Sequence, residues 1–279
     1  MKPFHTLLVG GALLLSAAPT TPARAQQAPS PYRTRFAVDA PVTAGLGVLS
    51  GLGLYLVQQK SGLTETQLAA LNKNDVPKFD RFAAGNYSDR AQLAGDILCY
   101  GSIAAVPGVL ALNPEVRGRY GQVMGLYLQT MLATDAAFTL TVGSVTRYRP
   151  FVYGTEGPEN KRRSKIATNS FFAGHTAHTA TATFFAAKVF HDFHPDSPAR
   201  PYVWGAAALV PAAVGYSRIA AGKHFLSDNL LGYALGATVG VVVPQLHKAS
   251  GGSGLSFTPI QGLNANGYSY GGLLITKQL

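Results

Sequence analysis

The sequence predicts an all-α protein with one core, and three observations bound this fold. Apolar stretches recur along the 279-residue chain at lengths of roughly 20 residues, which suit helices better than strands. Hydrophobic residues make up 47% of the chain, enough for one full core without a second domain of comparable size. The single cysteine, Cys99, excludes both an intrachain disulfide and a cysteine-rich metal site. We expect about six core helices, at 40–59, 91–112, 122–146, 170–190, 202–219 and 227–247.

The N-terminal residues have the pattern of an export signal. Lys2 precedes an apolar run at 7–18, and the sequence "ARA" at 23–25 has the small-x-small pattern of a signal-peptidase site. We therefore assign residues 1–25 to a signal peptide. The mature chain is then expected outside the cytoplasm, in the periplasm.

Residues 26–248 are expected to form the helical domain. A polar region separates the first two core helices and is expected to hold a shorter helix near 64–72. Glycines recur every four residues in the sixth expected helix, a spacing that allows close helix packing: Gly232, Gly236 and Gly240.

The C-terminal residues 249–279 differ in composition from the helical domain. They begin with "ASGGSG", which is typical of a flexible linker. Two apolar segments follow, at 255–261 and 268–276, around the pair Asn266-Gly267. Because Asn-Gly accepts the positive φ of a tight turn, we predict a small β-hairpin appended to the helices.

The charge of the chain favours anionic partners. The net charge is +10 and the pI is about 9.7, which suit phosphate esters, acidic lipid headgroups or nucleic acid. Nucleic acid is disfavoured because no basic stripe is interleaved with aromatic residues. No feature of the sequence indicates an obligate protein partner.

The stretch "SRIAAGKHFLSD" at 217–228 concentrates ionisable residues in an apolar region. If a helix begins near Ala221, His224 and Asp228 lie four residues apart on one face, so the carboxylate can orient the imidazole. Arg218 on the preceding turn can then hold an oxyanion through two hydrogen bonds. An ordinary helix N-terminus with an i,i+4 ion pair explains this stretch alone equally well.

Two further stretches carry matching chemistry. "TRYRPFVY" places Arg147 and Arg149 at the C-terminal end of the third expected helix, where a proline ends it. "NSFFAGHTAHTA" places Gly174 and His175 at the start of the fourth, where free backbone amides can face an anion. Ionisable groups at three ends of buried helices indicate that these ends meet at one site.

The order of these stretches resembles the three-part signature of the type-2 phosphatidic acid phosphatase and vanadium haloperoxidase superfamily. The third part matches the family spacing in full: Ser217-Arg218, five residues, His224, three residues, Asp228. The resemblance covers about 91–240 and implies a haloperoxidase-like helical bundle. In this family the third motif joins the fifth and sixth core helices, which is where it is expected here.

The resemblance also implies a role for each residue. His224 would attack phosphorus and form a phosphohistidine, with Asp228 holding its tautomer. His175 would protonate the leaving oxygen and later activate water. No metal or other cofactor is required for this chemistry. The phosphate oxygens would be held by Arg149, Arg218 and the Gly174 amide, with Arg147 and Ser217 as auxiliary residues.

Two positions depart from the family pattern. Val142 stands where a lysine is usual, seven residues before the arginine of the first motif, and Ala173 stands where a serine is usual. Each absent donor could cost about 3 kcal/mol of transition-state stabilisation. Substitutes are available in the loop "KRRSK" at 161–165, in Arg147 and in Lys223. We favour a solvated face for the loop, and Lys223 would point about 100° away from the neighbouring histidine on a helix.

The implied activity is that of a metal-independent phosphatase acting on phosphomonoesters or lipid (pyro)phosphates. One alternative is a vanadate-dependent haloperoxidase with vanadate as cofactor, although the missing lysine disfavours that anion. Another is a non-catalytic protein that binds phosphate or lipid. In a phosphatase, vanadate would act as an inhibitor. His178 suggests a metal site with His175, His224 and Asp228, but the arginines would repel a divalent cation.

The sequence leaves the relation to the membrane open. The helices are long enough to span, but Asp96 and Asp135 are costly in lipid, and the mean hydropathy of +0.13 is low for a six-span protein. Three spans after a cleaved signal would also place Arg149 in the cytoplasm. We therefore expect a periplasmic bundle, soluble or peripherally attached to the membrane, with an integral membrane form as the alternative.

Overall fold

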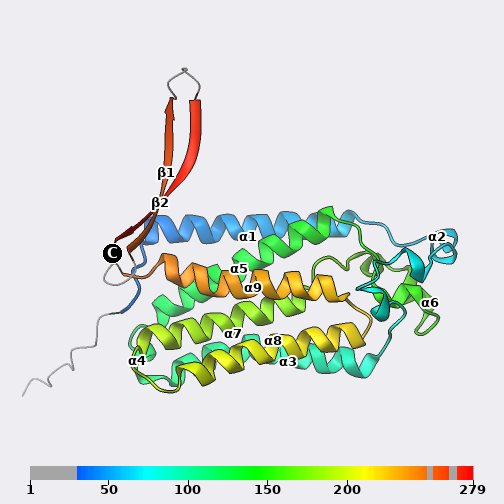
Figure 1. Cartoon of the computed structure of the whole chain (residues 1–279), viewed down its shortest axis with the longest axis horizontal. Helices are drawn as coiled ribbons and strands as arrows, with labels where there is room; N and C mark the ends of the chain where they lie inside the picture. Colours follow the sequence, from blue (N-terminus) through cyan, green and yellow to red (C-terminus); the bar gives the residue numbers. More distant parts are fainter. Residues whose placement is uncertain (1–29, 250–253, 264–268, 279) are drawn as a thin grey trace, which may run out of the picture.

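The computed structural model describes residues 30–249, 254–263 and 269–278, and six long helices dominate it (Figure 1). Consecutive long helices run in opposite directions along the bundle. The all-α class is confirmed, as are the six predicted helices, although the fourth begins four residues later than we expected. The expected signal peptide lies outside the described residues. The helices are α1 (Phe36–Gln59), α3 (Asp89–Leu112), α5 (Tyr120–Ser144), α7 (Gly174–Phe193), α8 (Arg200–Ala220) and α9 (Leu226–Leu246).

Short elements fill the connections at both ends of the bundle. The helix expected near 64–72 is the shorter α2, which Thr64 caps through a reciprocal pair of hydrogen bonds with Gln67. At the end where α3 finishes, α4 (Pro114–Arg117) leads into α5. The other end carries α2 (Glu65–Ala69), η1 (Lys73–Asp75), η2 (Arg81–Ala83), η3 (Pro150–Tyr153), α6 (Glu159–Arg163) and η4 (Lys165–Thr168).

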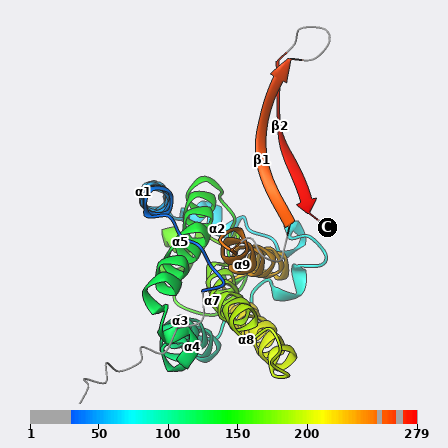
Figure 2. The ribbon, with the colours of Figure 1, turned by 90° about the vertical axis from the view of Figure 1, so that its left-hand side faces the viewer.

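Helix α7 is the centre of the bundle. It packs against α3, α5, α8 and α9, and the view along the bundle shows it between them (Figure 2). Its buried positions are rich in small side chains, including Ala177, Ala180 and Thr181. Small side chains on a central helix let several neighbours approach its backbone closely.

The predicted glycine stripe makes the tightest of these contacts. A Cβ atom at Gly236 of α9 would lie 2.1 Å from the carbonyl oxygen of Ala177 on α7. At Gly232 and Gly240 a Cβ would lie 2.6 and 2.7 Å from carbonyl oxygens of Ala173 and Thr181. The predicted close packing is therefore confirmed, and it brings the backbones of α7 and α9 together.

A buried ion cluster closes the end of the bundle where α7 finishes. The carboxylate of Asp192 accepts hydrogen bonds from the ammonium groups of Lys188 and Lys248 and from the hydroxyl of Tyr32. Asp192 is fully buried in this cluster. These contacts attach the segment that precedes α1 and the segment that follows α9 to the central helix α7.

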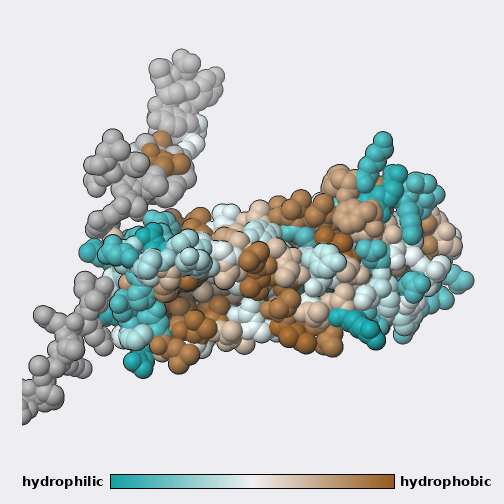
Figure 3. All heavy atoms as spheres, turned by 60° about the horizontal axis from the view of Figure 1, so that its bottom comes forward, coloured by the Kyte–Doolittle hydropathy of each residue, from teal (hydrophilic) through white to brown (hydrophobic). Residues whose placement is uncertain are grey.

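Large apolar side chains cover the outward faces of four helices. Val48 on α1 is 72% exposed, and Ile97, Leu209 and Leu230 are exposed on α3, α8 and α9. These four helices of the described chain are long and apolar enough to cross a membrane. Apolar residues gather along the middle of the bundle, between hydrophilic ends (Figure 3). Such a band favours contact with lipid.

The acidic residues that we weighed against membrane insertion are paired inside the bundle. Asp96 accepts a hydrogen bond of 2.6 Å from Arg218, and Asp135 lies 3.2 Å from Nε2 of His178. Pairing of this kind is how ionisable residues are tolerated within membrane proteins. The apolar band and these pairs favour the integral membrane form over the soluble bundle that we preferred from the sequence.

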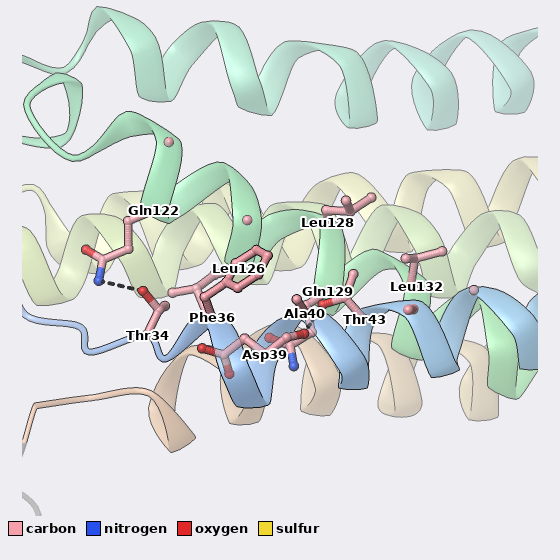
Figure 4. Close-up of a pocket in the computed structure, with 14 residues that line it drawn as sticks. Thr34, Phe36, Asp39, Ala40, Thr43, Gln122, Leu126, Leu128, Gln129 and Leu132 are labelled. Atoms are coloured by element: carbon pink, nitrogen blue, oxygen red, sulfur yellow. Dashed lines mark hydrogen bonds between the residues drawn. The ribbon is translucent and has the colours of Figure 1, made fainter.

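A cavity of about 650 Å³ lies between α1 and α5, near the start of α1 (Figure 4). It is lined mostly by apolar and small residues, among them Phe36, Gly47 and Leu126. Gln122 donates a hydrogen bond of 3.3 Å to the Thr34 hydroxyl at its edge. None of its lining residues belongs to the three motifs, so this cavity is separate from the predicted site.

The predicted C-terminal hairpin is present. Strands β1 (Gly254–Leu263) and β2 (Ser269–Gln278) pair antiparallel over their whole length. Both strands are longer than expected, and they project away from the helices (Figure 2). The expected Asn-Gly turn lies outside the described residues.

Replacing Gly236 tests the contact between α7 and α9. We expect Gly236→Ala to lower the free energy of unfolding by about 1 to 3 kcal/mol, because its Cβ overlaps a carbonyl oxygen. Gly101→Ala in α3 is the matched control, since no atom lies within 4 Å of its Cβ. The control should instead gain about 0.5 to 1 kcal/mol from helix propensity. Thermal unfolding in detergent measures the stability of both variants. Equal changes in the free energy of unfolding for Gly236→Ala and Gly101→Ala would contradict the close packing.

Candidate active site

A short backbone bridge aligns the first two motifs. Helix α5 ends at Ser144, so Arg147 and Arg149 lie beyond it in an extended segment and not at its C-terminal end as we predicted. The amide of Arg149 donates to the carbonyl of Ala167, and the amide of Ser170 donates to the carbonyl of Arg147. These bonds replace further helical ones and fix both motifs side by side.

The third motif crosses a tight turn, so the helix expected from Ala221 is wrong. Helix α8 continues to Ala220, and α9 begins only at Leu226. Gly222 has a φ of 68°, and a Cβ there would lie 1.8 Å from a carbonyl oxygen. This glycine lets the chain turn between the fifth and sixth long helices, where the family places this motif. His224 therefore precedes α9 and does not share a helix face with Asp228.

The imidazole of His224 is oriented by a backbone carbonyl. Its Nδ1 lies 2.7 Å from the oxygen of Ser170, whereas the nearest oxygen of Asp228 is 4.0 Å away. A carbonyl can only accept, so Nδ1 carries the hydrogen and Nε2 keeps its lone pair. The expected direct bond to Asp228 is thus absent. Asp228 instead accepts a hydrogen bond of 2.6 Å from the Ser170 hydroxyl. Asp228 is therefore connected to His224 through Ser170, whose carbonyl contacts the imidazole.

His224 is buried and neutral. Its side chain is nearly inaccessible to solvent. Burial, followed by the positive charges of Arg149 and Arg218, holds the pKa of His224 well below its ordinary value of 6.5. The Nε2 lone pair is consequently available at neutral pH, as a nucleophile requires.

Two guanidinium groups beside His224 keep unused donors. Arg149 makes no side-chain hydrogen bond or ion pair to any described residue, and its Nε is buried without a partner. Burial and the charge of Arg218 lower the pKa of Arg149 to about 9. Arg218 donates through Nη1 to Asp96, but its Nε is also buried without a partner. Buried donors without acceptors indicate a place for an anion.

The start of α7 adds backbone donors. The amide of Ala173 donates to the carbonyl of Asp228 at 3.0 Å, which sets this start beside α9. Among the described residues, the next two amides, of Gly174 and His175, have no acceptor. A Cβ at Gly174 would lie 2.6 Å from the ring of Phe138, so a larger residue there would have to displace this ring. The free amides and the helix dipole both favour an anion.

His175 shares a carboxylate with one of the arginines. Its Nε2 lies 3.0 Å from Oδ1 of Asp96, the same oxygen that accepts from Arg218. The ring of Tyr100 packs edge-on against His175 at 5.5 Å. We treated Asp96 only as an obstacle to membrane insertion, although an acidic residue within an apolar stretch is itself a signal for a functional site.

The two residues that we named as auxiliary are already engaged. Arg147 donates to Asp80 at 2.7 Å, to Ser227 at 2.9 Å and, by a very short contact, to Asp228. The hydroxyl of Ser217 donates to a carbonyl of its own helix. Neither side chain is placed as a free ligand for phosphate. The Asp80 carboxylate, fully buried beneath Arg147, was missed because it lies in a polar loop without a pattern.

The other cations proposed as substitutes for the absent lysine also have partners, Lys223 excepted. In the basic loop, Lys161 lies 3.5 Å from Asp89, and Arg163 lies 3.5 Å from Glu159. Val142, at the lysine position, is buried. Lys165 donates to the carbonyl of Gln58, and Arg162 donates to the carbonyl of Gly154.

His178 lies away from the anion site. Its two ring nitrogens face the carbonyl of Gly174 and the carboxylate of Asp135. Within the described ranges, no group of three or more histidine, cysteine, aspartate or glutamate side chains is arranged to hold a metal ion. The alternative metal site with His178 is therefore not formed.

Comparison with known proteins tests the family resemblance that the three motifs predict. A search of curated proteins finds no match. Among solved structures, the chain is similar to the first transmembrane PAP2 type phosphatidylglycerolphosphate phosphatase from Bacillus subtilis. That similarity has 15% sequence identity and a TM-score of 0.43, and it covers 75% of this chain and 94% of the other. Residues 124–251, which contain all three motifs, match the family model of the PAP2 superfamily. The resemblance carried by these motifs is thereby confirmed over residues 124–251.

Proposed function

We propose that the protein is a metal-independent phosphatase that acts through a phosphohistidine intermediate. One observation carries this proposal: the buried guanidinium groups of Arg149 and Arg218 keep unpartnered donors beside the neutral imidazole of His224. Buried cations without full compensation are costly, and a bound phosphoryl group would offset that cost. A neutral imidazole with a free Nε2 supplies the nucleophile in the same place.

In the first half of the reaction, the lone pair of His224 Nε2 attacks phosphorus and a P–N bond forms. The bond from phosphorus to the leaving oxygen breaks, and that oxygen takes a proton from His175. Charge on the equatorial oxygens is stabilised by Arg149, Arg218 and the Gly174 amide. The first product leaves as an alcohol.

In the second half, water attacks the phosphohistidine. His175 takes a proton from the water as its oxygen bonds to phosphorus, and the P–N bond breaks. The electron pair of that bond returns to His224 Nε2, so the enzyme regains its starting state with free phosphate. Burial and the positive charge of Arg218 lower the pKa of His175 to about 4, and Asp96, which contacts both His175 and Arg218, opposes this shift and would stabilise the imidazolium when His175 takes up a proton.

The surroundings of the site favour a lipid phosphate among the substrates. Leu93, Ile97 and Tyr100 on α3 are each more than half exposed beside Asp96, and Tyr216 on α8 is exposed next to Ser217. These side chains continue the apolar band of the bundle toward the site. A substrate with an apolar tail would bury this surface while its headgroup meets the arginines.

Loss of the nucleophile tests the proposal directly. We expect His224→Ala to lower turnover of an aryl phosphate, and of a lipid phosphate in detergent, by about a thousandfold or more. EDTA should leave the wild-type rate unchanged, and vanadate should inhibit it. His194→Ala is the control, since that imidazole contacts Asn113 and Glu115 far from the site. Turnover that survives His224→Ala, or that EDTA abolishes, would contradict the phosphohistidine route.

Other outcomes would favour the two alternative functions. Peroxide-dependent oxidation of halide by vanadate-loaded protein would favour the haloperoxidase. Binding of phosphate without turnover, on both kinds of substrate, would favour the non-catalytic protein.

Ser170 offers a test of how the nucleophile is oriented. Ser170→Ala keeps the carbonyl that accepts from His224 but removes the hydroxyl that fixes it to Asp228. We expect kcat to fall by about tenfold, because one hydrogen bond to a charged group is lost, while KM stays nearly constant. Steady-state kinetics with an aryl phosphate measures both constants. An increase in KM at constant kcat would indicate a role in substrate binding instead of positioning.

A further inference from the structure

We infer that Lys223 is a phosphate-binding residue, and that its ammonium replaces the lysine that is absent at position 142. This inference deepens the proposed function, since it assumes that the site beside His224 receives a phosphoryl group. It concerns binding of the anion and does not require turnover.

The structure places Lys223 differently from our expectation. It lies in the turn between α8 and α9 and not on a helix, so the angle of about 100° from the neighbouring histidine does not apply. Its amide donates to the carbonyl of Arg218 at 2.9 Å, which holds this part of the turn against the end of α8. The turn thus keeps Lys223 beside both His224, the proposed nucleophile, and Arg218.

Lys223 is largely buried, and its ammonium has no acceptor among the described residues. The residue is only 9% exposed. Its ammonium lies 5.1 Å from the centre of the Phe151 ring, and it has no hydrogen bond or ion pair with any described residue. Partial removal of an ammonium from water is costly unless an anion or several acceptors lie beside it. An incoming phosphate would supply the missing acceptors.

The charges around Lys223 point to the same anion. Burial, followed by the nearby positive charges of Arg149, Arg218 and Lys161, lowers the pKa of Lys223 to about 8, against the opposing effect of Asp89. These cations repel one another in the free protein. A dianion placed among Lys223, Arg149 and Arg218 would relieve this repulsion and meet their donors together.

Other cations in this region cannot take the same role. Lys60 donates to the carbonyls of Val142, Val145 and Thr168, so its three donors cap the end of α5. Arg147 is held by two carboxylates. Lys223 is the remaining lysine near His224 whose donors are unused in the described structure.

Equilibrium binding of tungstate to the full chain in detergent tests the inference by calorimetry. We expect Lys223→Met to weaken binding about tenfold to a hundredfold, and Lys223→Arg to retain most of the affinity. Lys78→Met is the control, because Lys78 is exposed and makes no hydrogen bond or ion pair with a described residue. Lys223→Met within about twofold of the wild type would overturn the inference.

The pH dependence of binding gives a second, independent readout. Tungstate keeps its charge at pH values around 8. The affinity of the wild type for tungstate should therefore fall as the pH rises through about 8 and Lys223 loses its proton. Lys223→Arg should keep its affinity there, because the guanidinium stays charged. If Lys223→Met does not fold, the comparison of the wild type with Lys223→Arg decides. A tungstate affinity of the wild type that varies with pH as little as that of Lys223→Arg would overturn the inference. Since no step needs turnover, an inactive protein can still confirm the role of Lys223, and an active one can refute it.

Discussion

Three glycines bring the backbone of α9 against that of α7, and both helices begin at the same end of the bundle. This contact aligns their first turns. The amide of Ala173 then reaches the carbonyl of Asp228, and the hydroxyl of Thr176 donates to Asn229 at 2.7 Å. Because His175 begins α7 and His224 immediately precedes α9, the same contact sets the two imidazoles at one site. Larger side chains at these glycine positions would separate the two helices and with them the two imidazoles.

The positively charged residues of the site differ in how far carboxylates neutralise them. Arg147 is neutralised by Asp80 and Asp228 and belongs to the scaffold. Arg218 is partly neutralised by Asp96. Arg149 and Lys223 have no carboxylate partner among the described residues. Stability is lost where cations remain uncompensated, and such a loss is typical of sites that must bind an anion.

The lengths of the apolar stretches were sufficient to predict the six long helices, because the backbone hydrogen bonds of a helix join residues four apart and do not depend on distant contacts. The motif spacing was also sufficient to select His224, His175, Arg149 and Arg218, which the fold brings together. The catalytic roles of these residues remain predictions.

Local geometry was harder to predict. We considered a helix that begins near Ala221 and runs through the third motif, although Gly222 in the middle of this motif signals a turn. Contacts between distant segments had no local signal at all. The bonds of Asp80 to Ser227 and of Ser170 to Asp228 join residues far apart in the chain, so no spacing rule could reveal them. Asp96 was the exception, since its charge stands out within an apolar stretch.

An odd number of long helices precedes Arg149, and this number decides at which end of the bundle the site lies. Helices α1, α3 and α5 precede this arginine, so the site lies at the end opposite the start of α1. The hairpin of β1 and β2 follows α9 at the other end. A bilayer around the apolar band would therefore divide the protein between two compartments. Chemistry on phosphate would take place in one of them, while the β-ribbon would be displayed in the other.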